Sequence, residues 1–216
     1  MNRLECAAII FDFDGTLADS MPFLESIGVQ VMRKYYDVSK EDATEKYRST
    51  TGLPYEQQIK LNFPNNPKND EAIEEFEKFK INRIFEQELF SDTEQTLQEV
   101  QLMDIDIFVS SSTFQSTIVE YFKRKGLLEY FVEVLGYRPG FEKGADHFEY
   151  VSKKYEIAVD ELVFVGDSLK DYERSIGYCD FIAVSRMFSE EQFRKMGHEG
   201  PVVHELAAVP EHLERT

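Results

Sequence analysis

The clearest pattern in the chain is an unbroken apolar run at residues 7–11 that ends in Asp-Phe-Asp-Gly-Thr at 12–16. A run of this length before turn-forming residues is typical of a strand buried on both faces, as in parallel sheets. Similar short runs predict further strands at 105–109, 131–135, 162–165 and 181–184, with a short edge strand at 201–203.

Helical patterns lie between these later runs, at residues 113–125, 146–155 and 171–176. The first ends at Gly126 and the last at Gly177, and glycine commonly follows the end of a helix. Strands that alternate with helices indicate βαβ units. We therefore predict an α/β fold with a doubly wound parallel sheet and helices on both of its faces.

Residues from about 20 to 101 are rich in charge, and their apolar positions have helical spacing, as at Phe23, Ile27 and Val31. Ser20 followed by Pro22 favours a helix start, and the breaks at 52–54 and 62–67 separate helices. The stretch predicts a bundle of about four helices inserted after the first strand. We expect a core domain of residues 1–19 and 92–216 and an inserted helical domain of residues 20–91.

Composition narrows the class of partner. The net charge of −17 argues against nucleic acid and against anionic membrane surfaces, both of which favour basic patches. No stretch is apolar for long enough to cross a bilayer, and the first residues do not resemble a signal peptide. Cys6 and Cys179 form neither a disulfide framework nor a zinc motif. We expect a cytoplasmic protein.

Asp12 and Asp14 are the first candidates for chemistry. Two carboxylates two residues apart on an extended segment project to the same side. Because they would repel each other, the pair implies a cation, a proton or a reaction that uses both. Mg²⁺ is a cation that favours such oxygen ligands, and Gly15 allows a tight turn and the close approach of a ligand.

Other polar residues follow the later predicted strands. In a parallel sheet the carboxyl ends of the strands meet at one edge, so these residues should lie near Asp12 and Asp14. Carboxylates, hydroxyls and a cation together are what phosphoryl transfer needs. The residues concerned are Ser110-Ser111-Ser112, Gly166-Asp167-Ser168, Arg138 and Lys143.

The order of these motifs resembles that of the haloacid dehalogenase superfamily of phosphatases, in the subfamily with a helical cap after the first motif. Asp-x-Asp-Gly-Thr at 12–16 is the first motif, and an apolar strand ending in Ser110 is the second. Residues 163–168 with Asp171 match the fourth motif. The third motif departs from the family's frequent Lys-Pro: here Lys143 precedes Gly144, and Arg138 is a second candidate for the cation. The resemblance implies a Rossmann-like core with a helical cap domain.

The resemblance also implies a role for each acidic residue. Asp12 would be the nucleophile that forms an aspartyl-phosphate, and Asp14 the general acid and base. Mg²⁺ would be held by the carboxylate of Asp12, the main-chain carbonyl of Asp14, and Asp167. Asp171 would hold Lys143 or a metal-bound water, and it also fits the start of a helix.

Residues around the phosphate and the rest of the substrate follow from the same resemblance. Ser110 would donate to the phosphoryl oxygens, and Lys143 would neutralise charge between the nucleophile and the phosphate. Ser111, Arg48 and Gly52 are candidate contacts to the substrate, the last two in the cap loop 48–54. Arg48 either holds a second anionic group or interacts with the end of its own helix.

The interpretation that these motifs favour is a Mg²⁺-dependent phosphatase acting on a small phosphorylated metabolite, similar to phosphoglycolate phosphatases, as a monomer or homodimer. Sugar-phosphate mutases use a cap histidine, and residues 20–91 contain none; all four histidines of the chain are expected to be structural or exposed. A dehalogenase does not need Asp14, and a non-catalytic phosphate-binding module does not need both Asp12 and Asp14. A phosphonatase stays open, because its cap lysine could be Lys34, Lys40, Lys46 or Lys60.

Overall fold

The structure is a computed structural model that describes residues 3–216. The chain forms two compact units, one made of residues up to Ala18 with Leu89–Thr216, and the other of Asp19–Glu88. Among the described residues, no helix is both long and apolar enough to span a membrane.

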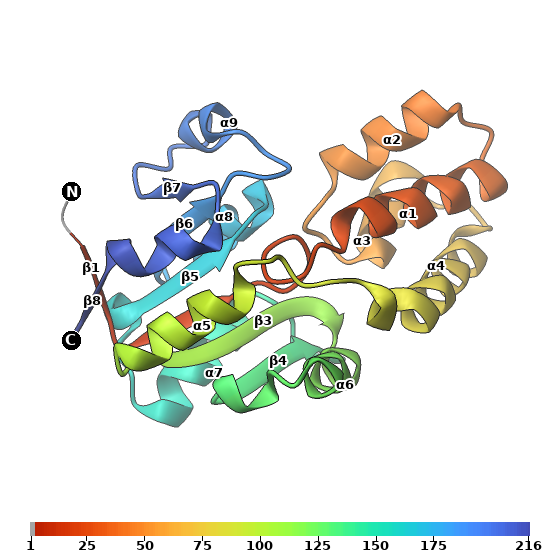
Figure 1. The fold of residues 1–216 in the computed structure, drawn as a ribbon. Coiled ribbons are helices and arrows are strands. Elements are labelled where there is room, and N and C mark those ends of the chain that lie inside the picture. Colours follow the sequence, from red (N-terminus) through yellow and green to blue (C-terminus); the bar gives the residue numbers. More distant parts are fainter. Residues whose placement is uncertain (1–2) are drawn as a thin grey trace. The chain divides into compact units, whose positions relative to one another are not determined.

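The first unit is built on a six-stranded sheet in which every neighbouring pair of strands is parallel. Its strand order is β4-β3-β2-β5-β6-β7 (Figure 1). The strands are β2 (Ala8–Phe11), β3 (Asp106–Phe114), β4 (Glu133–Tyr137), β5 (Leu162–Gly166), β6 (Asp180–Val184) and β7 (Val202–Val203). This confirms the predicted doubly wound α/β fold.

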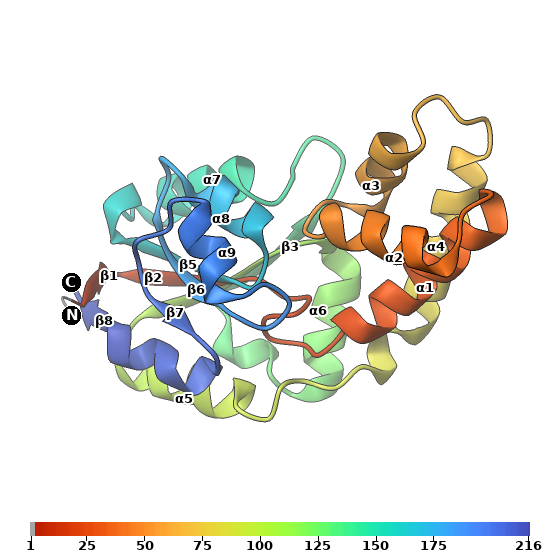
Figure 2. The same ribbon diagram turned by 90° about the horizontal axis from the view of Figure 1, so that it is seen from above.

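Helices cover both faces of this sheet. Figure 2 shows α5 (Thr93–Leu102) and α6 (Gln115–Lys125) on one face, and α7 (Ala145–Tyr155) and α8 (Leu169–Ser175) on the other. Every residue of β2 and β5 is buried, which explains their unbroken apolar runs. Alternate side chains face opposite sides, so Ile10 and Phe164 join the cluster that includes Phe148 of α7.

The remaining elements of this unit are short. They are α9 (Glu190–Lys195), the parallel pair β1 (Leu4–Cys6) and β8 (Leu213–Arg215), and the 3₁₀ turns Leu128–Tyr130, Val159–Glu161 and Leu206–His212. None of them was predicted, because segments of three to seven residues have too few positions to show a clear period.

Several predicted boundaries are wrong. The strand expected at 131–135 is observed as Glu133–Tyr137, and the one expected at 105–109 as Asp106–Phe114. The helix expected at 113–125 begins at Gln115, because β3 continues to Phe114 after a register shift against β4. The helical stretch 171–176 is observed as Leu169–Ser175, because Ser168 caps its first turn.

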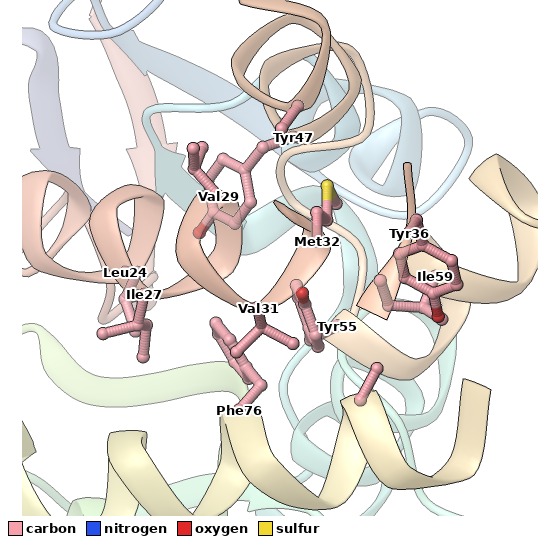
Figure 3. Packing of buried hydrophobic residues seen from close by; sticks show 12 residues of the cluster. Leu24, Ile27, Val29, Val31, Met32, Tyr36, Tyr47, Tyr55, Ile59 and Phe76 are labelled. Atoms are coloured by element: carbon pink, nitrogen blue, oxygen red, sulfur yellow. The ribbon is translucent and has the colours of Figure 1, made fainter. Parts of the chain in front are cut away.

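The second unit contains the helices α1 (Met21–Tyr35), α2 (Lys40–Ser49), α3 (Tyr55–Asn62) and α4 (Asn69–Arg83), followed by the 3₁₀ turn Ile84–Glu86. Figure 3 shows α1 and α4 side by side, with Val31 and Phe76 between them. Phe76 also stacks on Tyr55 at 3.7 Å between ring centroids. Helix α5, which lies within the stretch 20–101 predicted as helical, belongs to the first unit.

Candidate active site

The segment that follows β2 is fixed by packing and by its backbone. Phe13 is fully buried and meets Tyr121 and Phe122 of α6 edge-on, at 4.9 and 5.4 Å between centroids. Gly15 has a φ of 87°, which side-chain-bearing residues rarely adopt. The backbone N–H of Asp12 donates to the carbonyl of Val165 at 2.8 Å. Asp12 is therefore held at the carboxyl end of the sheet, beside β5.

Lys143 lies between two carboxylates in the interior. Its Nζ donates to Oδ1 of Asp12 at 2.7 Å and lies 2.5 Å from Oδ1 of Asp171, and none of the three side chains is more than 5% exposed. Arg138, the rival cation, is exposed and its guanidinium stacks over the ring of Phe141 at 4.2 Å. Of the two candidates, the structure brings only Lys143 into contact with Asp12.

The residue after Lys143 explains the departure from Lys-Pro. Gly144 has a φ of 111°, whereas a proline ring holds φ near −65°. A Cβ at Gly144 would lie 3.2 Å from the side chain of Arg174. The chain thus reaches Ala145, the first residue of α7, by a path that proline cannot follow.

Asp167 completes a buried acidic cluster. Asp12, Asp167 and Asp171 each offer a carboxylate oxygen within 4.8 Å of the others. The hydroxyl of Thr16 lies 3.3 Å from Oδ1 of Asp167 and 3.5 Å from Oδ2 of Asp12. Oδ2 of Asp167 is buried and has no hydrogen-bond partner within residues 3–216.

This donor set fits a divalent cation. A buried carboxylate oxygen without a partner is unfavourable, and hard cations take oxygen ligands. Asp12 and Asp167 are two of the three metal ligands expected from the sequence. Asp171, which was expected to act beside the metal rather than on it, also has an oxygen within the cluster.

Burial shapes the charge state of these groups. It raises the pKa of Asp12 to about 7, against the opposing attraction of Lys143. Burial, and next the charge of Asp12, raises the pKa of Asp167 well above its usual range. Burial also lowers the pKa of Lys143, but the attraction of Asp12 and Asp171 outweighs this and leaves it raised. Lys143 is therefore cationic, and a metal ion would displace protons from the carboxyls.

The spacing of Gly166, Ser168 and Asp171 has a local cause. Ser168 caps α8 by accepting from the N–H of Asp171 at 3.1 Å, and its own hydroxyl donates to Oδ2 of Asp171 at 2.7 Å. A Cβ at Gly166 would lie 2.7 Å from Cβ of Asp171, so a larger residue does not fit there. Asp171 thus pairs with Lys143 and also closes the first turn of the helix, as the sequence suggested.

The end of β3 supplies the serines. Oγ of Ser110 is 2.8 Å from Nδ1 of His147, and both residues are fully buried. Burial, followed by the charge of Lys143, lowers the pKa of His147 to about 3, so the ring is neutral. Ser111 accepts from the backbone N–H of Thr113 at 3.0 Å.

Asp14 has a partner that the sequence did not reveal. The hydroxyl of Thr113 donates to its Oδ2 at 2.7 Å. The sequence pattern predicts Thr113 in the following helix, whereas the structure has it in β3, where the register against β4 shifts between Ser110 and Phe114. No short motif marks such a residue, because its position depends on how β3 pairs with β4.

Arg48 and Gly52 belong to the other unit, Asp19–Glu88. There the guanidinium of Arg48 donates to Glu25 twice, Nε to Oε2 at 2.7 Å and Nη2 to Oε1 at 2.9 Å. Its partner is thus a carboxylate of α1 rather than the end of its own helix. Gly52 has a φ of 93° in the turn before α3.

Comparison with known proteins gives consistent matches. Residues 9–182 match the family described as haloacid dehalogenase-like hydrolase. The phosphoglycolate phosphatase of Photobacterium profundum is 23% identical over 173 residues, which is 76% of each chain. That of Vibrio vulnificus is 22% identical over 181 residues, 79% of each chain.

Solved structures share the fold. A haloacid dehalogenase-like family hydrolase from Streptococcus pneumoniae has a TM-score of 0.81 at 20% identity, covering 95% of this chain and 97% of that one. A predicted phosphatase from Clostridium acetobutylicum has a TM-score of 0.82 at 18% identity, covering 98% of both. The predicted class of enzyme, a phosphoric monoester hydrolase, agrees with these matches. The chain belongs to the haloacid dehalogenase-like hydrolase family and is similar within it to phosphoglycolate phosphatases, as the order of its motifs predicts.

Proposed function

We propose that the protein is a Mg²⁺-dependent phosphatase that hydrolyses a small phosphorylated metabolite through an aspartyl-phosphate. The observation that carries the proposal is the buried arrangement in which Lys143 bridges Asp12 and Asp171 beside Asp167. Three buried carboxyl groups lie beside one ammonium, and a divalent cation would displace the protons that burial favours on Asp12 and Asp167.

In the proposed mechanism Asp12 attacks phosphorus, and the leaving alcohol takes its proton from Asp14. A water then attacks the phosphorus of the aspartyl-phosphate while Asp14 accepts its proton, which releases phosphate and restores Asp12. Lys143 and the hydroxyl of Ser110 would stabilise charge on the phosphoryl oxygens. Mg²⁺, held by Asp12, Asp167 and the main-chain carbonyl of Asp14, would neutralise further charge there.

The matched relatives suggest the substrate class. Both are named phosphoglycolate phosphatases, so we propose a small phosphorylated acid as the first substrate to test. An anionic second group would bind Arg48 only if it displaced Glu25, or bound beside it. The cytoplasmic location and the monomeric or homodimeric state stay predictions from the sequence.

A phosphonatase is the less supported alternative. Such an enzyme needs an uncharged cap lysine, which burial would favour. Lys34, Lys40 and Lys60 are exposed, and Lys46 lies over the ring of Phe63 at 5.5 Å. A hydrogen bond to Glu75 raises the pKa of Lys34, which is the opposite of what imine formation requires.

The test is a panel of phosphate esters assayed with Mg²⁺ and with a chelator, for the wild type and for Asp12→Asn. We expect Mg²⁺-dependent release of phosphate by the wild type and none by Asp12→Asn, because only a carboxylate can form the aspartyl-phosphate. Mass spectrometry of acid-quenched enzyme should find phosphate on the peptide with Asp12. Near-normal turnover of Asp12→Asn, with deamidation excluded, would contradict the covalent route.

A further inference from the structure

Arg186 lies in the loop after β6 and reaches back to the segment that follows β2. Its Nη1 donates to the carbonyl of Gly15 at 3.0 Å and to that of Thr16 at 2.6 Å. These two residues end the Asp-x-Asp-Gly-Thr motif. A single cation thus binds two consecutive carbonyls of the loop that carries Asp12 and Asp14.

The guanidinium of Arg186 is itself fixed from other sides. Its Cζ lies 3.3 Å from the centroid of the Phe90 ring, and its Nη2 lies 3.8 Å from Oδ1 of Asp92. Oδ2 of Asp92 accepts from the backbone N–H of Ala207 at 3.1 Å, so the carboxylate also has a fixed place. The side chain of Arg186 is 17% exposed. A planar cation stacked on a ring and partly shielded from water is well suited to hold a loop.

Arg186 therefore contacts both segments by which the chain leaves the first unit after Ala18 and re-enters it at Leu89. The two segments are also joined directly. The N–H of Phe90 and the hydroxyl of Thr93 both donate to the carbonyl of Leu17, at 3.1 and 2.8 Å. The two segments thus form a junction, and the Arg186 side chain, from the loop after β6, adds contacts to both of them.

The junction connects to the acidic cluster through Thr16. Arg186 holds the carbonyl of Thr16, whose hydroxyl lies between Oδ1 of Asp167 and Oδ2 of Asp12. A displacement of this backbone would move a hydroxyl that touches both carboxylates. Reacting groups tolerate little displacement, so a small shift there should cost turnover.

We propose that Arg186 is a positioning residue, which fixes the backbone of Gly15 and Thr16 and thereby the relative placement of Asp12 and Asp167. The effect on turnover rests on the proposed function, whereas the effect on the loop does not. Neither the comparisons nor the motifs of the sequence single out this residue.

The experiment compares Arg186→Lys and Arg186→Met with a matched control, Arg194→Lys. Arg194 makes a similar clamp elsewhere in the same unit, since its Nη1 donates to the carbonyls of His198 and Gly200 at 2.9 and 2.7 Å. Lysine keeps the charge but cannot stack a planar fork on Phe90, and methionine keeps an apolar contact but donates nothing. Each protein is assayed with p-nitrophenyl phosphate and Mg²⁺, and its amide hydrogen exchange is followed by mass spectrometry.

We expect kcat of both Arg186 variants to fall by about tenfold or more with KM within about twofold, because alignment rather than binding is lost. Amide exchange should become faster in peptides covering residues 12–18 and 89–93. Arg194→Lys should leave kcat within about twofold and speed exchange only near residues 190–200.

Unchanged kcat in both Arg186 variants, or a loss no larger than that of Arg194→Lys, would overturn the proposal. If the wild type hydrolysed no phosphate ester, the proposed function would fail, and hydrogen exchange alone would decide the role of Arg186. In that case, unchanged exchange at residues 12–18 in both variants would refute it. If Arg186→Lys did not fold, Arg186→Met would carry the same comparison.

Discussion

Lys143 and Arg138, the two candidate cations, differ in their surroundings. Lys143 is buried against two carboxylates, whereas Arg138 is exposed on the ring of Phe141. Lys143→Ala should raise the barrier to turnover by about 3 kcal/mol, as for the loss of one preorganised electrostatic group. Arg138→Ala should leave kcat within about twofold. Steady-state kinetics of both variants decide between them, and an inactive Arg138→Ala with an active Lys143→Ala would reverse the assignment.

The second prediction for a single residue concerns the hydroxyl of Thr113 and its effect on turnover. It donates to Oδ2 of Asp14 at 2.7 Å, and Asp14 is half-buried. Thr113→Val keeps the shape of the side chain but removes the donor, so we expect kcat to fall by about tenfold through loss of orientation. Thr113→Ser keeps a hydroxyl and should retain most of the activity. Equal kcat values for the two variants would show that the hydrogen bond has no part in turnover.

Single residues were predictable where a motif fixes both identity and place. Asp12, Asp167 and Lys143 were named from spacing and resemblance, and the structure brings all three together. Thr113 and Arg186 were not found, because each acts through a contact to a segment about one hundred or more residues away, which no local pattern records.

Among the elements, the long apolar runs were the reliable signal. Strands β2 and β5 are buried on both faces and appear in the sequence as continuous hydrophobic runs. The hydrophobic pattern misses the end of β3, because residues 110–113 are polar yet remain extended. The register against β4 shifts within this segment. Polar residues in a strand next to a site defeat the hydrophobic pattern that finds strands elsewhere.

The register shift between β3 and β4 can be tested by substituting Gly136 of β4. A Cβ at this position would lie 2.5 Å from Cα of Gln115 and 2.6 Å from the carbonyl oxygen of Thr113, both backbone atoms that cannot swing away. We expect Gly136→Ala to reduce the free energy of unfolding by about 2–3 kcal/mol and to lower kcat by displacing Thr113.

Gly126 supplies the control for this substitution. It has a φ of 74° with nothing within 4 Å of an added Cβ, so Gly126→Ala should cost only about 1 kcal/mol from backbone strain and leave kcat unchanged. Chemical denaturation measures both costs. A smaller loss for Gly136→Ala than for Gly126→Ala would mean that the backbone near Thr113 yields easily.

At the scale of the whole molecule, the charge of −17 and the buried acids of the site point to the same need for cations. A strongly acidic surface does not attract an anionic substrate, so local positive charge has to dominate at the site. Lys143 supplies one such charge, and its cluster leaves carboxylate oxygens for a metal ion. The composition indicates that an acidic chain needs local cations to bind an anionic substrate. Only the folded chain shows that Lys143 and the acidic side chains of the site are buried together.

The same cluster predicts how stability depends on pH and Mg²⁺. Burial raises the pKa of Asp12 to about 7 and that of Asp167 well above its usual range, so without metal these carboxyls hold protons that the unfolded chain would release. A carboxyl whose pKa is raised by folding favours the folded state below its unfolded pKa of about 4, and that contribution is lost as the pH rises through the folded value. The contribution of these groups to the free energy of unfolding of the metal-free protein should therefore decrease from about pH 4 to about pH 7, and should continue to decrease above pH 7.

Mg²⁺ should reverse this loss, because it binds the ionised carboxylates and competes with protons. We expect the increase in Tm on adding Mg²⁺ to be larger at about pH 8 than at about pH 5. Asp167→Asn should remove most of that increase, because the variant loses a carboxylate whose Oδ2 has no partner among residues 3–216. Thermal denaturation with Mg²⁺ and with a chelator tests this, and Glu211→Gln, at an exposed position, is the control for loss of one negative charge. A Mg²⁺ effect on Tm that is independent of pH, or unchanged in Asp167→Asn, would place the cation elsewhere.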